Sequence, residues 1–561
     1  MLQIRRAIHH VGRQRGFATL PESADVVVVG GGLAAHRAAS QSAKNKANTL
    51  VLSIDDIGVG DAIGIDGIAA PLQEPSPQIH TNDTIVGGDY LSDQDIVYSC
   101  MNSAIKQVDF LEKCGVIFQR DAKGLPDVKA VNGHSKPRLV TSGDSLNRET
   151  FRVLEEQCLK YGVVRRGNQL PISLATKNEK ISGIIVLDMN TGRLESIQAK
   201  TIIIADSGFE SSWRGRGSGI GMDLALRAGI SLRDMEFQYW SIFISDTEIQ
   251  IPHSLIADGA EILSSNGEDL GLERTDTSTQ IALKISEITQ VVLDARTLNG
   301  ASSWWQSWKE MVQKRTGINP DKQTLPVDAR VSMTIGGIPI DEHGRAISNR
   351  WSRWFTGLYA AGESACSGIH GADAIAGNRL LDNLVSASSA GVHAAQWASK
   401  TNFSGTQIIS EELERCQTEI DSMLQNREGD VYRIGSVGKS LQNLMMQKMN
   451  LHRSEEGLIS AEIGLVDLVE KSSNLYCDDA STLYNDNLRS NISLQAAIRL
   501  CLAATRSAME RKESRGSHLR EDFMDKDASQ LHHSLINANG EYETLAIRKG
   551  PAGSWLLSPE Q

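Results

Sequence analysis

The hydrophobic pattern begins with a short β-branched run that ends in glycines. Residues 24–30 read ADVVVVG, and residues 33–43, LAAHRAASQSA, have the apolar spacing of a helix. A second apolar run, NTLVLSI, occupies residues 48–54. Strand, glycine turn, helix and strand in this order predict a βαβ unit, and therefore an α/β fold with a parallel sheet.

The pattern changes several times along the rest of the chain. Residues 181–205 alternate between apolar and polar positions and predict a β-meander. Residues 238–325 are polar, contain tryptophans and lack clear periodicity, which is typical of an inserted domain. Strand and glycine-turn character returns at residues 331–384, and apolar residues three and four apart predict helices over residues 410–511. The last thirty residues are mixed, with room for one short strand pair.

The composition is that of an ordinary globular chain, with 22% charged and 40% hydrophobic residues among 561. The net charge of −12 argues against nucleic acid as the main partner. Seven cysteines without a CxxC pair fit a reducing compartment and argue against a cysteine-held metal centre in this chain. No apolar run reaches the length of a membrane span, so membrane association requires a partner.

The first twenty-one residues differ from the rest. They contain Arg5, Arg6, Arg13 and Arg15, and no acidic residue precedes Glu22. Arginines without acids, followed by small residues, predict a mitochondrial presequence that is removed from the mature chain. The alternative is a disordered basic tail. In either case residues 1–21 do not belong to the fold.

A glycine turn connects the first strand to the first helix. It reads Gly30-Gly31-Gly32-Leu33-Ala34-Ala35, a GxGxxA variant. Such a turn lets the backbone approach a pyrophosphate, and the helix N-terminus that follows faces the anion. The same turn also occurs in plain packing. At the end of the second strand Ser53 stands where an acidic residue would bind a ribose, so ribose recognition is not confirmed.

Several segments together resemble the flavoprotein subunits of succinate dehydrogenase and fumarate reductase. Residues 357–384, GLYAAGESACSGIHGADAIAGNRLLDNL, resemble the C-terminal flavin-binding signature of that family. Further matches are DTIVGGDYLSDQD at residues 83–95, LRDMEF at 232–237, TIGGIP at 334–339 and RKESRGSHLREDF at 511–523. They follow in the family's order along nearly the whole chain after residue 24.

The resemblance implies an architecture. The family has a Rossmann-type FAD-binding domain split by a capping domain, then a helical domain and a small C-terminal domain. On this chain we expect the presequence at residues 1–21, the FAD-binding domain at 22–240 and 330–400, the capping domain at 241–329, the helical domain at 405–527 and the C-terminal segment at 528–561.

The resemblance also implies FAD as the cofactor. The expected binding residues are Gly30, Gly31, Gly32, Leu33, Ala34, Ala35, Ser53, Gly362, Glu363, Asn378, Arg379 and Leu380. The family's covalent histidine falls at Gly60 or Asp61, so FAD should be held without a covalent bond. Residues 218–221 lack the acid that the family places near the adenosine. Arg379 replaces a small serine, where it either stabilises a reduced flavin or points to solvent.

The family's dicarboxylate-binding and proton-transfer groups fall on neutral residues: Ser241, Ser254, Ile285, Ser332 and Ala374. We therefore expect no catalytic residue of the family to remain, and no metal site. His253, Arg274 and Lys284 are the evident polar replacements in the capping region, although such residues more often lie on the surface. His370 is more consistent with packing beside the flavin than with catalysis.

These observations predict a divergent succinate dehydrogenase (complex II) flavoprotein-like subunit that is not an ordinary succinate oxidase. Its role would be assembly or regulation in electron transport and the tricarboxylic acid cycle. The alternative is an active FAD-dependent oxidoreductase of the same fold with succinate, fumarate or another substrate. By resemblance the partners are an iron–sulfur subunit and a membrane anchor, on the matrix side of the mitochondrial inner membrane.

Overall fold

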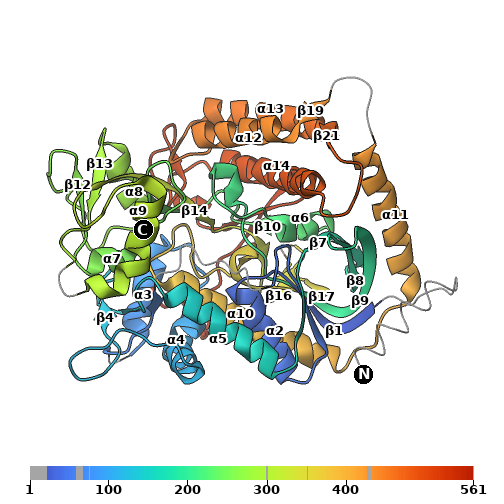
Figure 1. Ribbon diagram of the computed structural model, residues 1–561, viewed down its shortest axis with the longest axis horizontal. Helices are drawn as coiled ribbons and strands as arrows, with labels where there is room; N and C mark the ends of the chain where they lie inside the picture. Colours follow the sequence, from blue (N-terminus) through green and yellow to red (C-terminus); the bar gives the residue numbers. More distant parts are fainter. Residues whose placement is uncertain are drawn as a thin grey trace.

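The computed structural model describes residues 22–57, 67–74, 76–298, 301–349, 351–425 and 431–559. A largely parallel sheet lies at its centre, with strand order β16-β17-β9-β1-β2-β6 (Figure 1). β1 pairs in parallel with β2 on one side and with β9 on the other. The strands are β1 Glu22–Val29, β2 Thr49–Leu52, β6 Val164–Arg166, β9 Arg193–Ile204, β16 Arg345–Ile347 and β17 Trp354–Ala360.

Both faces of this sheet are covered, which explains its uninterrupted β-branched strands. Val26 and Val28 pack against the helices α2 Leu33–Lys44 and α10 Asn378–Ala398, while Val27 and Val29 belong to the core on the opposite side. α2 packs in turn against α5 Leu146–Lys160. The predicted βαβ unit and α/β fold are confirmed.

The predicted meander is also present. β7 Gln169–Thr176 pairs with β8 Ile181–Asp188, and β8 pairs with β9, both antiparallel. Farther along, α3 Gln78–Gly87 and α4 Gln94–Cys114 pack with a small antiparallel sheet around an apolar cluster that they share with α5 and the start of α10.

The capping region is an insertion with its own core. β11 Gln238–Ile244 pairs with β14 Leu325–Thr334, and this ribbon continues into β13 Val291–Asp294 and β12 Glu261–Ser264. The helices α7 His253–Ala257, α8 Ser278–Ser286 and α9 Gln306–Thr316 complete it. Trp305 and Trp308 are buried in its apolar cluster. Because the ribbon runs across the expected boundaries at 240/241 and 329/330, those boundaries stay predictions.

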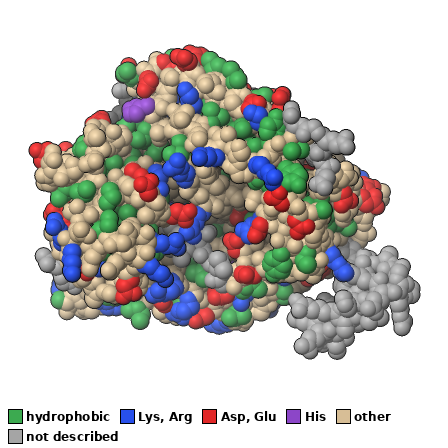
Figure 2. Space-filling view, turned by 45° about the horizontal axis from the view of Figure 1, so that its top comes forward, with side chains coloured by type: hydrophobic (Ala, Val, Ile, Leu, Met, Phe, Trp, Pro, Cys, Tyr) green, Lys and Arg blue, Asp and Glu red, His purple; other side chains and the backbone are tan. Residues whose placement is uncertain are grey.

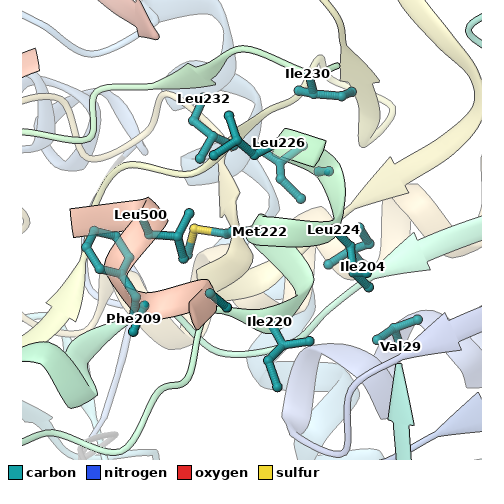
Figure 3. Packing of buried hydrophobic residues seen from close by; sticks show 14 of the residues in the cluster. Val29, Ile204, Phe209, Ile220, Met222, Leu224, Leu226, Ile230, Leu232 and Leu500 are labelled. Carbon is teal, nitrogen blue, oxygen red and sulfur yellow. The ribbon is translucent and has the colours of Figure 1, made fainter. Parts of the chain in front are cut away.

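Helices follow after the second part of the sheet domain. They are α11 Thr406–Leu424, α12 Ile434–Lys448, α13 Glu455–Ser472 and α14 Asp486–Glu510. The short helix α6 Ile220–Arg227 connects them to the sheet, because its side chains face both. Figure 3 shows Met222 and Leu224 of α6 in the core that contains Ile204 of β9 and Leu500 of α14.

The C-terminal segment packs onto the sheet domain through a small sheet. β23 His533–Ile536 pairs with β24 Tyr542–Leu545 and with β10 Leu232–Arg233.

None of the helices in the described ranges is long and apolar enough to cross a membrane. The remaining short elements are β3 Ile68–Ala69, β4 Val128–Lys129, β5 Leu139–Val140, β15 Ile338–Pro339, β18 Ala365–Cys366, β19 Tyr432–Arg433, β20 His452–Arg453, β21 Leu475–Tyr476, β22 Leu519–Arg520 and the 3-10 turns η1 Glu210–Trp213, η2 Ser302–Trp305, η3 Gly362–Ser364 and η4 Ala528–Gln530.

Buried ion pairs join these parts. His533 of the C-terminal segment lies between two carboxylates, with Nδ1 2.7 Å from Asp234 and Nε2 3.2 Å from Asp93. Arg233 pairs with Asp93 at 3.1 Å. Burial alone would lower the pKa of His533, but the two carboxylates raise it to about 9. Burial would likewise raise the pKa of Asp93, yet His533 and Arg233 lower it to about 2. All four groups are therefore charged at neutral pH.

A second buried cluster anchors the end of the helical region. Arg511 pairs with Glu236 at 2.6 Å and with Glu513 at 3.1 Å, and all three side chains are fully buried. Arg515 pairs with the same Glu513 at 2.8 Å and donates to the backbone carbonyl of Asp89 at 2.9 Å. The segments at 83–95, 232–237 and 511–523 thus meet at one place.

We expect Arg511→Gln to destabilise the protein strongly, because it leaves the buried carboxylate of Glu236 without its charged partner. Breaking a buried pair in this way costs about 3–5 kcal/mol. Arg506→Gln in α14, which ends just before Arg511, breaks a partly exposed pair with Glu462 and should cost less than about 1 kcal/mol. Urea unfolding of both variants measures the difference, and equal losses would contradict the assigned role of the buried cluster.

Candidate functional site

The glycine turn lies between the carboxyl ends of β1 and β2, where sheets of this type bind ligands. Gly30 has φ +132°, and a Cβ there would lie 2.1 Å from the carbonyl oxygen of Ala205. A Cβ on Gly31 would lie 2.3 Å from Oγ of Ser53. α2 begins directly after Gly32, and its first turn contains no acidic residue. The turn therefore presents an open helix N-terminus at a position where the backbone tolerates no side chain.

The second signature folds against the first. Gly362 follows β17 with φ +67°, and a Cβ there would lie 2.6 Å from Cβ of Ala34. α10 begins at Asn378 after Gly377, which has φ +81°. The Asn378 side chain is held by His80 Nε2 at 2.8 Å and donates to Thr84 Oγ1 at 2.9 Å. Residues as far as 298 positions apart in the chain are thus joined by hydrogen bonds.

The expected FAD-binding residues fall into two groups, those with buried apolar side chains and those with polar side chains. Leu33, Ala35 and Leu380 are buried in apolar clusters, so only their backbone could serve a ligand. Ser53 is also buried, at the end of β2 beside Gly31. Arg379 donates from Nε to Glu363 at 2.6 Å, and its side chain is only 15% exposed. The solvent-facing alternative for Arg379 is therefore wrong.

Two acidic residues near the Gly30 and Gly362 turns were not predicted from the sequence. Asp206 follows β9, and its Oδ2 accepts the backbone N–H of Gly221 at 3.2 Å at the start of α6. Glu210 is buried, and its carboxylate accepts the N–H of Thr334 at 3.0 Å. Burial and the neighbouring Glu363 raise the pKa of Glu210 to about 7. Residues 218–221 lack an acid of their own, but the fold places Asp206 beside them.

The expected substrate positions form neutral contacts. Ser241 on β11 and Ser332 on β14 lie 2.7 Å apart, hydroxyl to hydroxyl, and Gln250 Nε2 donates to Ser241 at 3.1 Å. Ile285 is 5% exposed and packs in the core of the capping region. Ala374 is 2% exposed in another apolar cluster. Ser254 is fully buried in α7.

Two cavities lie beside these residues. The smaller, of about 20 Å³, is lined from the flavin signature by Ala374, Gly377 and Arg379, and from the capping region by Gln250 and His253. The larger, of about 290 Å³, is lined mainly by the capping region, and Ser241 and His253 contribute to its wall. The face shown in Figure 2 has a hollow near its middle, around which Lys and Arg side chains gather.

The polar replacements occupy different places. Lys284 pairs with Asp276 at 2.7 Å and donates to the Gly271 carbonyl, so its charge is neutralised within the capping region. Arg330 pairs with Asp328 at 2.6 Å and donates to the Thr247 carbonyl. His253 and Arg274 both line the larger cavity.

Other expected sites are structural or undescribed. His370 is buried with Nε2 3.4 Å from Asp382, which supports packing rather than catalysis. No cluster of His, Cys, Asp and Glu in the described ranges could hold a metal ion. The presequence at residues 1–21 and the covalent-histidine position at Gly60 or Asp61 lie outside the described residues.

Two family models match this chain. Residues 25–380 match the FAD binding domain, and residues 438–554 match the fumarate reductase flavoprotein C-term. The chain belongs to the succinate dehydrogenase and fumarate reductase flavoprotein family. FAD is accordingly its cofactor, and the Gly30 turn, the open start of α2 and the Gly362 contact fit a dinucleotide.

Curated relatives match almost the whole chain. The 8-methylmenaquinol:fumarate reductase flavoprotein subunit of Wolinella succinogenes is 25% identical and covers 95% of this chain and 93% of its own length. The fumarate reductase flavoprotein subunit of Mycobacterium tuberculosis is 27% identical, covering 94% and 98%. The succinate dehydrogenase flavoprotein subunit of Rickettsia bellii is 26% identical, covering 96% of each chain.

Solved structures share the fold. E. coli quinol fumarate reductase aligns with a TM-score of 0.88 at 23% identity, covering 96% of this chain and 98% of that one. Mycobacterium smegmatis Sdh1 aligns with a TM-score of 0.79 at 23% identity, covering 94% and 95%. The expected architecture of a split FAD-binding domain, a capping domain, a helical domain and a C-terminal domain is therefore confirmed.

We expect Gly30→Ala to lose most of its bound FAD, because the new Cβ would collide with the Ala205 carbonyl and displace the turn. Gly229→Ala is the matched control: Gly229 also has a positive φ, of +101°, but no atom lies near its Cβ position. The flavin-to-protein ratio from absorbance measures the effect. Full flavin content in folded Gly30→Ala would contradict the assigned role of the turn.

Proposed function

We propose that this protein is an FAD-binding, complex II-type flavoprotein that neither oxidises succinate nor reduces fumarate at ordinary rates. The observation that carries the proposal is Ile285. By the register of the family resemblance it falls where the family has its proton-transfer arginine, and it packs in an apolar core. An isoleucine can neither hold a proton nor pair with a carboxylate.

The remaining substrate positions support the same conclusion. A dicarboxylate removed from water needs charged donors for both of its ends, because charge-assisted hydrogen bonds offset the desolvation cost. Ser241 and Ser332 instead bond to one another, and Ala374 presents only a methyl group. Each missing charged donor lowers the rate about 10²–10³-fold, although such losses need not add.

The residues proposed to hold FAD are those that surround the Gly30 turn and the start of α10. Backbone N–H groups after Gly32 and the start of α2 would receive the pyrophosphate. Asp206 would supply the acid that residues 218–221 lack, and the ion pair of Glu363 with Arg379 would lie at the start of α10. When bound, FAD supplies a two-electron acceptor.

The relatives are named as subunits, which supports a multi-subunit setting for this chain. We propose an iron–sulfur subunit and a membrane anchor as partners, and the matrix side of the mitochondrial inner membrane as location. The basic, acid-free residues 1–21 support the location. We propose an assembly or regulatory role because charged dicarboxylate-binding groups are missing at the expected positions.

A second candidate is an active oxidoreductase with a less anionic substrate. The larger cavity favours it, because Arg274 and His253 are the only ionisable side chains that line it in the described part of the chain. Reduction of bound FAD under anaerobic conditions by a monocarboxylate, but not by succinate, would support this candidate over the first.

We expect purified, FAD-loaded protein to show no succinate-dependent dye reduction and no fumarate-dependent oxidation of a reduced dye. Malonate, a dicarboxylate that inhibits the family, should not raise its melting temperature. A fumarate reductase flavoprotein from the family, assayed alongside, is the positive control. Succinate turnover that scales with FAD content would overturn the proposal.

We also expect acid precipitation to release all of the flavin, because neither Gly60 nor Asp61 offers a ring nitrogen for a covalent bond. Absorbance of the supernatant and of the redissolved pellet measures the partition. Flavin fluorescence that stays with the denatured chain on a gel would refute non-covalent binding.

A further inference from the structure

The cavity of about 290 Å³ is formed where the capping region meets the sheet domain. Strands β11 and β14 and helices α7 and α8 supply most of its wall, and residues 130–132 close it from the other domain. Its volume is near the lower end of the range of about 300–1,000 Å³ found for small-molecule sites. It therefore has room for a compact organic molecule.

Most of the lining is apolar. The larger side chains are Trp240, Ile242, Ile251, Ile256, Leu272 and Ile281. They come from different elements and converge on the same space, so a ligand body would be enclosed by side chains of the capping region. Burying an apolar or aromatic group here contributes about 25 cal/mol per Å² of area removed from water.

The charged groups among the described lining residues are basic. Arg274 lines the cavity, and no described carboxylate forms an ion pair with its guanidinium. No aspartate or glutamate is among the lining residues in the described part of the chain, whereas His253 and Asn132 are. The indole Nε1 of Trp240 is buried and has no hydrogen-bond partner among the described residues. Among the described residues the cavity thus offers one permanent cation, the exposed Arg274, and a spare indole donor, but no carboxylate.

In the described part of the chain Arg274 is the one Lys or Arg side chain that lines this cavity, which separates it from a dicarboxylate site. Lys284 and Arg330 are paired with Asp276 and Asp328 and do not line it. A dianion would leave its second carboxylate among isoleucines without a charged donor, and burying such a group is costly. A monoanion could place its single charge on Arg274 and its body among the apolar side chains.

We propose that this cavity binds a monocarboxylate with a compact apolar or aromatic body, whose carboxylate pairs with Arg274 and whose body packs against Trp240 and Ile281. The proposal rests on the proposed function only in taking the dicarboxylate groups as lost. It concerns binding and requires no chemistry at the flavin.

The test uses calorimetric titration of the full FAD-loaded protein with phenylacetate as the probe. Phenylacetamide has the same shape without the charge, and succinate has a second charge. We expect phenylacetate to bind with one site per chain, phenylacetamide to bind at least about tenfold more weakly because it lacks a charge-assisted bond, and succinate not to bind.

Two variants locate the site. Arg274→Gln should weaken phenylacetate at least about tenfold while leaving phenylacetamide unchanged, since only the charged partner is removed. Arg315→Gln is the matched control, because Arg315 is an exposed arginine of the same region, in the last turn of α9, and does not line the cavity. It should bind phenylacetate as the wild type does.

Three results would overturn the inference: no heat of binding for phenylacetate, equal affinity for phenylacetamide, or the same loss in both arginine variants. Succinate turnover is measured separately in the dye assay. Turnover together with Arg274-dependent phenylacetate binding would refute the proposed function alone. Absence of both turnover and binding would refute the monocarboxylate site alone.

Discussion

Buried ion pairs hold the parts of this chain together. One buried cluster is shared by Asp93 of the sheet domain, by Arg233 and Asp234 just before the capping ribbon, and by His533 of the C-terminal segment. Burying such charges is expensive, and their mutual attraction repays the cost only while every partner is present. The relative placement of the domains is therefore specified at this junction, and the cavities beside the ribbon depend on it.

The same junction explains why the family resemblance indicated the architecture but not the substrate. Three of the family-like segments, at 83–95, 232–237 and 511–523, contribute charged side chains to these buried clusters. Charged residues there have defined partners and cannot vary independently. They identify the architecture reliably and carry no information on substrate chemistry, because none of them lines either cavity beside the flavin signature.

Local patterns predicted the fold well for simple physical reasons. The run at Val26–Val29 is apolar at every position because both faces of its strand are covered, and Gly30 follows because no Cβ fits beside Ala205. Asp206 and Glu210 were missed because their role depends on contacts with Gly221 and Thr334, which only the folded chain creates. The sequence could not show which of Arg274 and Lys284 lines a cavity, since both are cations on a polar stretch. In the fold Lys284 pairs with Asp276, whereas Arg274 lines the larger cavity.

The neutral residues at the expected substrate positions are mutually consistent. Removing a single charged group from a closed site usually leaves its neighbours without partners. Here Ser241 and Ser332 satisfy one another, Ile285 adds to an existing core, and Ala374 packs among apolar residues. These positions therefore form a self-consistent neutral set, with no unpaired charge among them.

The placement of β17 has a consequence for how the protein folds. β17 is followed by Gly362 and pairs with β9, although the whole capping region separates the two strands in the chain. Pairings between segments so distant in the chain close late, because a long loop must be ordered first. During synthesis, the glycine turn at Gly30 cannot contact Gly362 until the capping region and β17 have been made. Retention of FAD would thus report that folding of the whole sheet domain is complete.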